Sequence, residues 1–102
     1  MNEKARELKL LNTGFSNPHG LPNALNTSSA KDIIKLSRYC AKNKLFKEIM
    51  NSQTYSYTLF QEPEHLELTG VWKNTNRLLE RGWEGVKTGY TISAGNCLAS
   101  IK

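Results

Sequence analysis

The sequence predicts an α+β fold in which helices come first and antiparallel strands follow. Up to about residue 50, apolar residues gather on one side of helical stretches, whereas from residue 54 onward β-branched and aromatic residues become frequent. The chain has 102 residues, of which 38% are hydrophobic, and this suffices for one small domain. We therefore expect a single domain over residues 1–102, with a helical part over about 1–50 and a strand-rich part over about 54–102.

The helical part is expected to contain three helices and one long loop. Residues 2–10 fit the end of an amphipathic helix, and residues 12–27 are rich in Asn, Gly and Pro, which predicts a structured loop. The stretch Ser29-Ala30-Lys31-Asp32 fits a capping box with an aspartate in its last position, so a helix should begin there and run to about Lys42. Asn43 interrupts this pattern, and a shorter helix over 44–50 follows. The positions expected on the inner faces of these two helices are Ile33, Ile34, Leu36, Ser37, Cys40, Leu45, Phe46 and Ile49.

The strand-rich part is expected to form antiparallel pairs. Residues 54–60 read Thr-Tyr-Ser-Tyr-Thr-Leu-Phe, which is typical of a strand, and residues 66–69 can pair back after a turn at 62–65. Residues 86–92 and 96–101 predict two further strands around a tight turn at Ser93-Ala94-Gly95. The tyrosines and tryptophans, Tyr55, Tyr57, Trp72 and Trp83, are interpreted as core or sheet-surface residues.

The formal net charge is +5, and its distribution argues against a nucleic-acid partner. The basic residues between Lys31 and Lys47 recur through one helical region, where a solvated helix face explains them. A nucleic-acid surface would show a dense basic stripe with interleaved aromatic residues or a known motif, and the sequence has neither.

The two cysteines, Cys40 and Cys97, form no CxxC motif and have no histidine at metal-ligand spacing. Both are expected to be buried free thiols, although the sequence also allows a disulfide between them. No stretch has the length of a transmembrane helix, and the charged start of the chain is no signal peptide. Because the first helix has no capping residue before it, we expect that the N-terminus was cut from something longer.

One stretch does not fit a plain core strand. Residues 82–91 read GWEGVKTGYT, in which Lys87, Thr88 and Gly89 follow one another. A core strand favours valine and isoleucine and avoids glycine in its middle. Taken alone, these residues fit an edge strand with a solvated lysine and a glycine bulge.

Several segments together are more specific than this strand alone. The chain resembles the serine D-alanyl-D-alanine carboxypeptidases, which are low-molecular-mass penicillin-binding proteins with a β-lactamase/transpeptidase-like fold. The matching segments come in the order of that family and with roughly its spacing. The segments that carry the resemblance cover nearly the whole chain: Met1-Asn2-Glu3-Lys4-Ala5, Asn17-Pro18-His19-Gly20-Leu21, Ser28-Ser29-Ala30-Lys31-Asp32 with Arg38-Tyr39, Asn74-Thr75-Asn76-Arg77-Leu78-Leu79, and Gly85-Val86-Lys87-Thr88-Gly89-Tyr90-Thr91 with Ala94-Gly95.

The resemblance implies that Lys87-Thr88-Gly89 is the KTG motif of an acyl-transfer site. Lys87 would place a positive charge beside the nucleophile and the terminal carboxylate of the substrate, and Thr88 would donate a hydrogen bond to that carboxylate. Gly89 would let an extended substrate lie against the strand, and the backbone N–H of Tyr90 would contribute to the oxyanion hole. The resemblance implies no metal and no organic cofactor. It implies structural roles for a further group of residues: Asn17, His19, Gly20, Asn74 and Asn76.

The other two motifs of the resemblance, S-x-x-K and S-x-N, should lie upstream of Met1. Ser28-Ser29-Ala30-Lys31 does spell S-x-x-K, but the nucleophile of such a motif lies inside the first turn of a helix, with its lysine one turn later on the same side. If Ser29 is the N-cap, Ser28 lies outside the helix. No S-x-N occurs in the chain. We therefore expect this chain to lack its nucleophile.

The implied parent enzyme would hydrolyse the terminal D-alanine of peptidoglycan stem peptides through an acyl-enzyme, be acylated by β-lactams, and act outside the cytoplasm. Three alternatives remain: an inactive remnant that at most binds a partner, a β-lactamase or esterase relative, and a basic interaction module. Without the nucleophile helix, a strand edge and apolar surface would stay open, so we expect marginal stability or self-association.

Overall fold

The computed structural model describes residues 1–61 and 66–102, and the turn expected at 62–65 lies outside them. The three α-helices precede the strands, which confirms the α+β prediction. The two pairs of strands form separate antiparallel hairpins, β1–β2 and β3–β4, rather than one sheet. In chain order the elements are α1 (Asn2–Glu7), α2 (Ala30–Cys40), α3 (Lys44–Asn51), β1 (Thr54–Gln61), β2 (Leu66–Lys73), the 3-10 helix η1 (Arg77–Arg81), β3 (Glu84–Thr91) and β4 (Gly95–Ile101).

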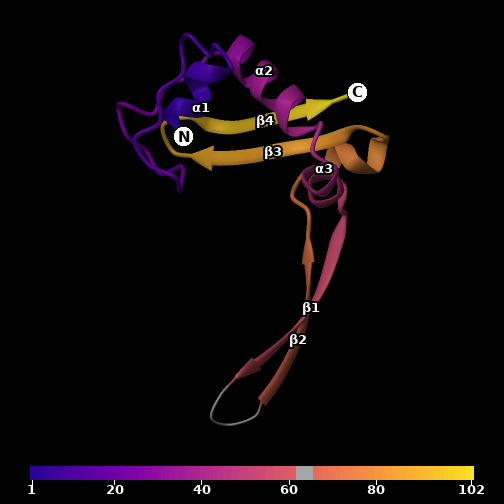
Figure 1. Ribbon diagram of the computed structural model, residues 1–102. Coiled ribbons are helices and arrows are strands. Elements are labelled where there is room, and N and C mark those ends of the chain that lie inside the picture. The colour runs from indigo at the N-terminus through magenta and orange to yellow at the C-terminus, as the bar shows by residue number, and fades with distance from the viewer. Residues whose placement is uncertain (62–65) are drawn as a thin grey trace.

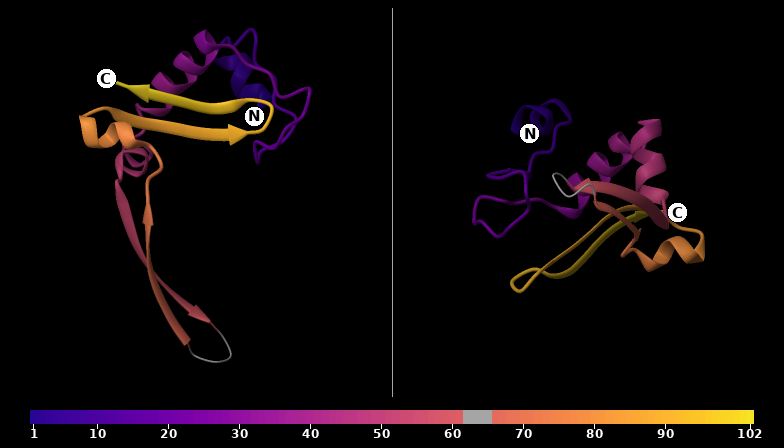
Figure 2. Two further views of the ribbon diagram at one scale, coloured as in Figure 1. Left: turned by 180° about the vertical axis from the view of Figure 1, so that it is seen from behind. Right: turned by 90° about the horizontal axis from the view of Figure 1, so that it is seen from below.

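The molecule is elongated because one hairpin projects from the rest. Figure 1 shows α2 lying along the β3–β4 hairpin, while β1 and β2 extend away from it beyond α3. The view from behind shows the same projection (Figure 2). We call the β1–β2 hairpin the arm. The radius of gyration is 16.5 Å, whereas a compact domain of this length has about 13 Å.

Helix α2 begins where the sequence predicts, but the capping box is only half formed. Ser29 is the N-cap, and its Oγ accepts a hydrogen bond from the Asp32 N–H at 3.2 Å. The Asp32 carboxylate does not return to the N-cap. It accepts bonds from the Asn12 N–H at 2.8 Å and the Thr13 hydroxyl at 2.9 Å, and the Asp32 side chain is almost fully buried. A buried carboxylate needs hydrogen-bond donors, and here the loop supplies them in place of the N-cap backbone N–H.

Several polar side chains of the loop over 12–27 hydrogen-bond the backbone of the same loop. Asn17 Oδ1 accepts a bond from the Gly20 N–H at 2.9 Å, and His19 Nδ1 accepts one from the Leu21 N–H at 3.1 Å. Gly20 has φ of +77°, a left-handed conformation that favours glycine. Gly14 and Thr27 form an isolated antiparallel bridge that closes the loop.

Helix α3 attaches the β3–β4 hairpin to the helical part. Asn43, which the sequence predicts as an interruption, is the N-cap of α3. At the other end of the helix, Met50 is buried and Asn51 Oδ1 accepts a bond from the Gly85 N–H at 2.9 Å. An ion pair of 2.7 Å between Lys47 and Glu84 lies beside this contact.

The core is small, and this corrects several sequence expectations. Among the described residues only four hydrophobic side chains are buried, namely Ala5, Leu10, Met50 and Leu79. Leu45, Phe46, Ile49 and Ile34 are exposed rather than part of the core. The accessible surface is 8499 Å², whereas a compact monomer of 11.5 kDa exposes about 5,800 Å².

The prediction of two buried thiols is also wrong. Both cysteines are free, but Cys40 is half-buried and Cys97 is exposed. Cys97 lies on β4 opposite Gly89, and within the described residues β4 pairs only with β3. A strand of a two-stranded hairpin is therefore less covered than its apolar sequence suggests.

Two strand boundaries differ from the predicted ones by more than one residue. β2 continues to Lys73 rather than ending at Thr69, and β3 begins at Glu84 rather than Val86. Within the described ranges 1–61 and 66–102, no helix is long and apolar enough to cross a membrane, and no group of three His, Cys, Asp or Glu residues lies close enough to hold a metal ion.

Candidate functional site

The Lys87-Thr88-Gly89-Tyr90 segment occupies the fourth to seventh residues of β3. Lys87 is opposite Ala99, Thr88 opposite Leu98, and a register shift between Gly85 and Lys87 precedes them. β3 pairs with β4 along one edge, and no described strand pairs with its other edge. A strand with one open edge can bind an extended peptide by backbone hydrogen bonds.

The side chains of this segment differ in their surroundings. The Lys87 ammonium donates a hydrogen bond to the backbone carbonyl of Thr88, so the cation lies over its own strand. Thr88 is half-buried, and its Oγ1 lies 2.9 Å from Thr75 Oγ1. A Cβ atom at Gly89 would meet no atom within 4 Å, so the strand surface is open at that residue.

The turn between the arm and η1 supplies Thr75, and two asparagines hold this turn. Asn74 Nδ2 donates to the Ser52 carbonyl at 3.0 Å, and Asn74 Oδ1 accepts from the Asn76 N–H at 2.9 Å. Asn76 Oδ1 accepts from the Leu78 N–H at 3.0 Å and caps η1. Asparagine suits these positions because its side chain hydrogen-bonds the backbone of its own turn.

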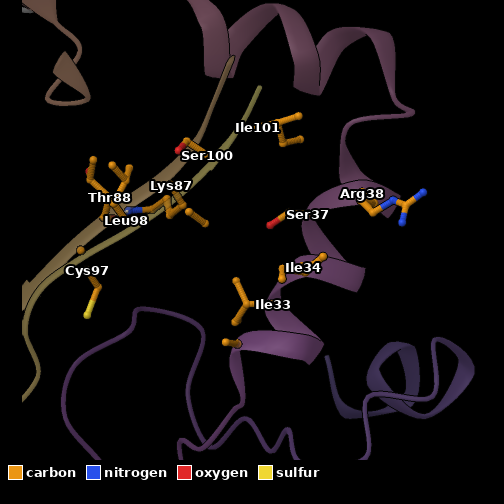
Figure 3. Close-up of a pocket in the computed structure, with 13 residues that line it drawn as sticks. Ile33, Ile34, Ser37, Arg38, Lys87, Thr88, Cys97, Leu98, Ser100 and Ile101 are labelled. Atoms are coloured by element: carbon orange, nitrogen blue, oxygen red, sulfur yellow. Dashed lines mark hydrogen bonds between the residues drawn. The ribbon is translucent and has the colours of Figure 1, made fainter. Parts of the chain in front are cut away.

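A groove of about 630 Å³ separates α2 from the β3–β4 hairpin. Figure 3 shows Ile33 and Ser37 of α2 pointing toward the hairpin, where Lys87, Thr88 and Leu98 lie, while Arg38 points away. The described walls of the groove are largely aliphatic, with Lys87 as the cation on the hairpin side. An aliphatic groove with a few polar groups is the usual form of a small-molecule site.

Ser28 does not occupy the position of a helix nucleophile. It precedes the N-cap Ser29 and therefore lies outside α2, as the sequence predicts. Its Oγ lies 2.9 Å from Thr13 Oγ1 in the loop. Thr75 and Asn51 were assigned no role from the sequence, although they contact Thr88 and Gly85 across 13 and 34 residues of chain. No local sequence signal predicts such contacts.

Comparison with known proteins agrees with this arrangement. The family model described as D-alanyl-D-alanine carboxypeptidase matches residues 1–101. The chain belongs to the D-alanyl-D-alanine carboxypeptidase family. The resemblance and the partial α+β fold predicted from the sequence are thereby confirmed.

Individual relatives show how much of such a protein the chain represents. It is 40% identical over 102 residues to the D-alanyl-D-alanine carboxypeptidase DacF of Bacillus subtilis, and the match covers 98% of this chain and 25% of that protein. It is 33% identical over 100 residues to the D-alanyl-D-alanine carboxypeptidase of a Streptomyces strain, covering 96% of this chain and 34% of that protein. The chain thus spans about a quarter to a third of the length of these relatives.

Solved structures give the same result. The crystal structure of the Streptomyces K15 DD-transpeptidase superposes with a TM-score of 0.88 at 33% identity, over 97% of this chain and 38% of that one. The D-alanyl-D-alanine carboxypeptidase of Mycobacterium tuberculosis superposes with a TM-score of 0.70 at 25% identity, over 93% of this chain and 35% of that one. The elongated shape of the chain is therefore a conformation that larger proteins also contain.

Proposed function

We propose that this chain is the substrate-binding part of a serine-type D-alanyl-D-alanine carboxypeptidase. The whole enzyme hydrolyses the terminal D-alanine of peptidoglycan stem peptides through an acyl-enzyme on a nucleophilic serine. β-Lactams acylate that serine as well. The observation that carries the proposal is the Lys87-Thr88-Gly89 sequence on a strand with one open edge, beside a groove of about 630 Å³. Because the substrate is a cell-wall polymer, the enzyme acts outside the cytoplasm.

Each residue of the segment has a role that its chemistry supports. The Lys87 ammonium attracts the terminal carboxylate of the peptide, and the Thr88 hydroxyl donates a hydrogen bond to it. The open surface at Gly89 lets the peptide backbone approach the strand. The backbone N–H of Tyr90 donates to the oxyanion that forms when a serine attacks the carbonyl.

Covalent chemistry requires an activated serine, which no residue in the described ranges 1–61 and 66–102 provides. An acyl-enzyme needs a serine activated by a neighbouring base, and Ser28 lies outside α2 in a hydrogen bond to a loop threonine. The chain alone therefore binds the peptide without cleaving it, and the nucleophile comes from a further segment that carries S-x-x-K and S-x-N.

Peptide binding to the chain tests this proposal. Amide chemical shifts are followed by NMR while an acetylated peptide ending in D-Ala-D-Ala is added, with the L-Ala-L-Ala peptide as the stereochemical control. We expect shifts at Lys87 to Tyr90 with the D-peptide only. Lys87→Met should weaken binding by about tenfold, since a charge-assisted hydrogen bond is lost. The matched variant Lys73→Met, at the base of the arm, should bind normally. Equal shifts with both peptides would contradict the proposal.

We further propose that the chain self-associates, through its open strand edges and one face of the arm. Tyr55, Tyr57 and Trp72 share that face, and the ring centroids of Tyr57 and Trp72 are 4.6 Å apart. Leu59 and Leu68 continue it, so none of the described residues on this face is charged. A two-stranded hairpin is marginally stable on its own, so packing against another surface would stabilise the arm. Two copies related by a two-fold axis would bring the same uncharged face together without repulsion, although each chain carries a net charge of +5.

A further inference from the structure

Thr75 contacts the segment to which the proposed function assigns substrate binding. Its Oγ1 lies 2.9 Å from Thr88 Oγ1, and either hydroxyl can be the donor. Thr75 comes from the turn after the arm, not from β3 or β4. We propose that Thr75 is a positioning residue for Thr88, because its hydroxyl directs the Thr88 proton toward the carboxylate of a bound peptide. This inference rests on the proposed function.

The chemistry follows from what a hydroxyl can donate. A threonine hydroxyl has one proton and two acceptor sites. If Thr88 donates to Thr75, Thr88 presents only lone pairs to the substrate, and these repel a carboxylate. If Thr75 donates to Thr88, the Thr88 proton is free to point at the carboxylate. A bound anion selects the second arrangement, and the bond from Thr75 then polarises the Thr88 hydroxyl and strengthens its donation.

The surroundings of Thr75 hold it in place. It lies between Asn74, which is bonded to the Ser52 carbonyl, and Asn76, which is buried and caps η1. On the other side, the Thr88 carbonyl accepts a bond from the Lys87 ammonium. The Thr88 residue is thus held at its backbone by the cation and at its side chain by Thr75. Both groups that the proposed function directs at the carboxylate meet at this residue.

Two peptides that differ in one group separate positioning from a general structural role. The first is the acetylated D-Ala-D-Ala peptide with a free carboxylate, and the second is the same peptide with a C-terminal carboxamide. Binding is measured for the wild-type chain, Thr75→Val, Thr75→Ser and a control, Thr69→Val, which makes the same change on the arm. We expect Thr75→Val to weaken binding of the carboxylate peptide by about fivefold, with a smaller effect on the carboxamide. Thr75→Ser should restore binding, and Thr69→Val should have no effect.

Equal weakening for both peptides, or no rescue by Thr75→Ser, would overturn the inference. If the wild-type chain binds neither peptide, the proposed function fails, and a second measurement still decides the role of Thr75. Three-bond couplings report the χ1 rotamer of Thr88 without any ligand. One rotamer is expected in the wild type and in Thr75→Ser, and rotamer averaging in Thr75→Val. An unchanged Thr88 rotamer in Thr75→Val would overturn the inference without reference to substrate binding.

Discussion

The backbone N–H of Gly85 donates a hydrogen bond to Asn51 Oδ1 at 2.9 Å, and this bond joins the end of α3 to the start of β3. The approach is close, because a Cβ atom at Gly85 would lie 2.6 Å from the Met50 carbonyl oxygen. The strand that carries Lys87-Thr88-Gly89 is therefore anchored to α3 near its start, at Gly85. The residues that follow are left free to bind a peptide.

Gly85→Ala should destabilise the chain by about 2 kcal/mol, because the added methyl group forces Met50 and β3 apart. Gly89→Ala, on the same strand, should leave stability within about 0.5 kcal/mol, since no atom lies within 4 Å of the new Cβ. Urea denaturation followed by circular dichroism measures both. In the peptide titration, Gly89→Ala should weaken binding more than Gly85→Ala does. The added methyl group at residue 89 lies where the peptide is expected to bind. Equal stability of the two variants would contradict this account of the anchor.

Asp32→Ala should cost about 2 kcal/mol or more, because it leaves the Asn12 N–H and the Thr13 hydroxyl without their acceptor. The loop over 12–27 should lose protection against amide hydrogen exchange in the same variant. Lys31→Ala, one residue earlier on the exposed side of α2, is the matched control and should be nearly neutral. A loss of stability without a change in loop protection would show that the carboxylate acts on the helix alone.

Labelled penicillin should not attach covalently to the 102-residue chain, because no serine among the described residues lies in the first turn of a helix with a lysine one turn later. Denaturing gel electrophoresis after incubation gives the answer. Ser28→Ala should behave like the wild type. Labelling that disappears in Ser28→Ala would make Ser28 a nucleophile and refute the proposal that the nucleophile comes from a further segment.

Tyr55→Lys should weaken self-association, because a two-fold interface would place the new charges opposite each other. The control is Phe60→Lys, which makes the same change on the same strand but on the opposite face of the arm, where Phe60 is exposed. Sedimentation velocity should show the wild-type mass rising from 11.5 kDa toward twice that value with concentration. A wild-type chain that stays monomeric, or equal effects of both variants, would refute association through this face.

The two thiols should react at different rates with an aromatic disulfide reagent. Cys97 is exposed on β4 and should react quickly, whereas Cys40 is half-buried on α2 and should react slowly. Cys97→Ser should remove the fast phase and leave the slow one. Two slow phases in the wild-type chain would mean that β4 is covered in solution, which the proposed self-association would then have to explain.

Much of the local structure was predictable because it depends on neighbouring residues. Ser29 and Asn43 cap helices through side chains that reach only three residues along the chain. Asparagine side chains in the loop over 12–27 hydrogen-bond backbone groups a few residues away. The strands coincide with stretches rich in β-branched and aromatic residues. These features require no knowledge of distant contacts, so the order of elements agreed with the structure.

Burial was the part that local patterns could not predict. Cys97 and Ile49 have sequence surroundings typical of a core, yet both are exposed, because burial depends on which elements lie opposite. Asp32 differs in the opposite direction. Its sequence position fits a capping box at a helix end, yet it is almost fully buried because the loop packs against it. A pattern shows which side of an element is apolar but not what covers that side.

By itself, the sequence determined the α+β order, the Ser29 cap of α2, and the family through the KTG segment and the other matching segments. Only the tertiary structure placed Thr75 against Thr88 and Asn51 against Gly85, and only it showed that the arm projects. The physical reason is that caps and turns are fixed by interactions over a few residues. A contact between hydroxyls 13 residues apart depends instead on how whole elements pack.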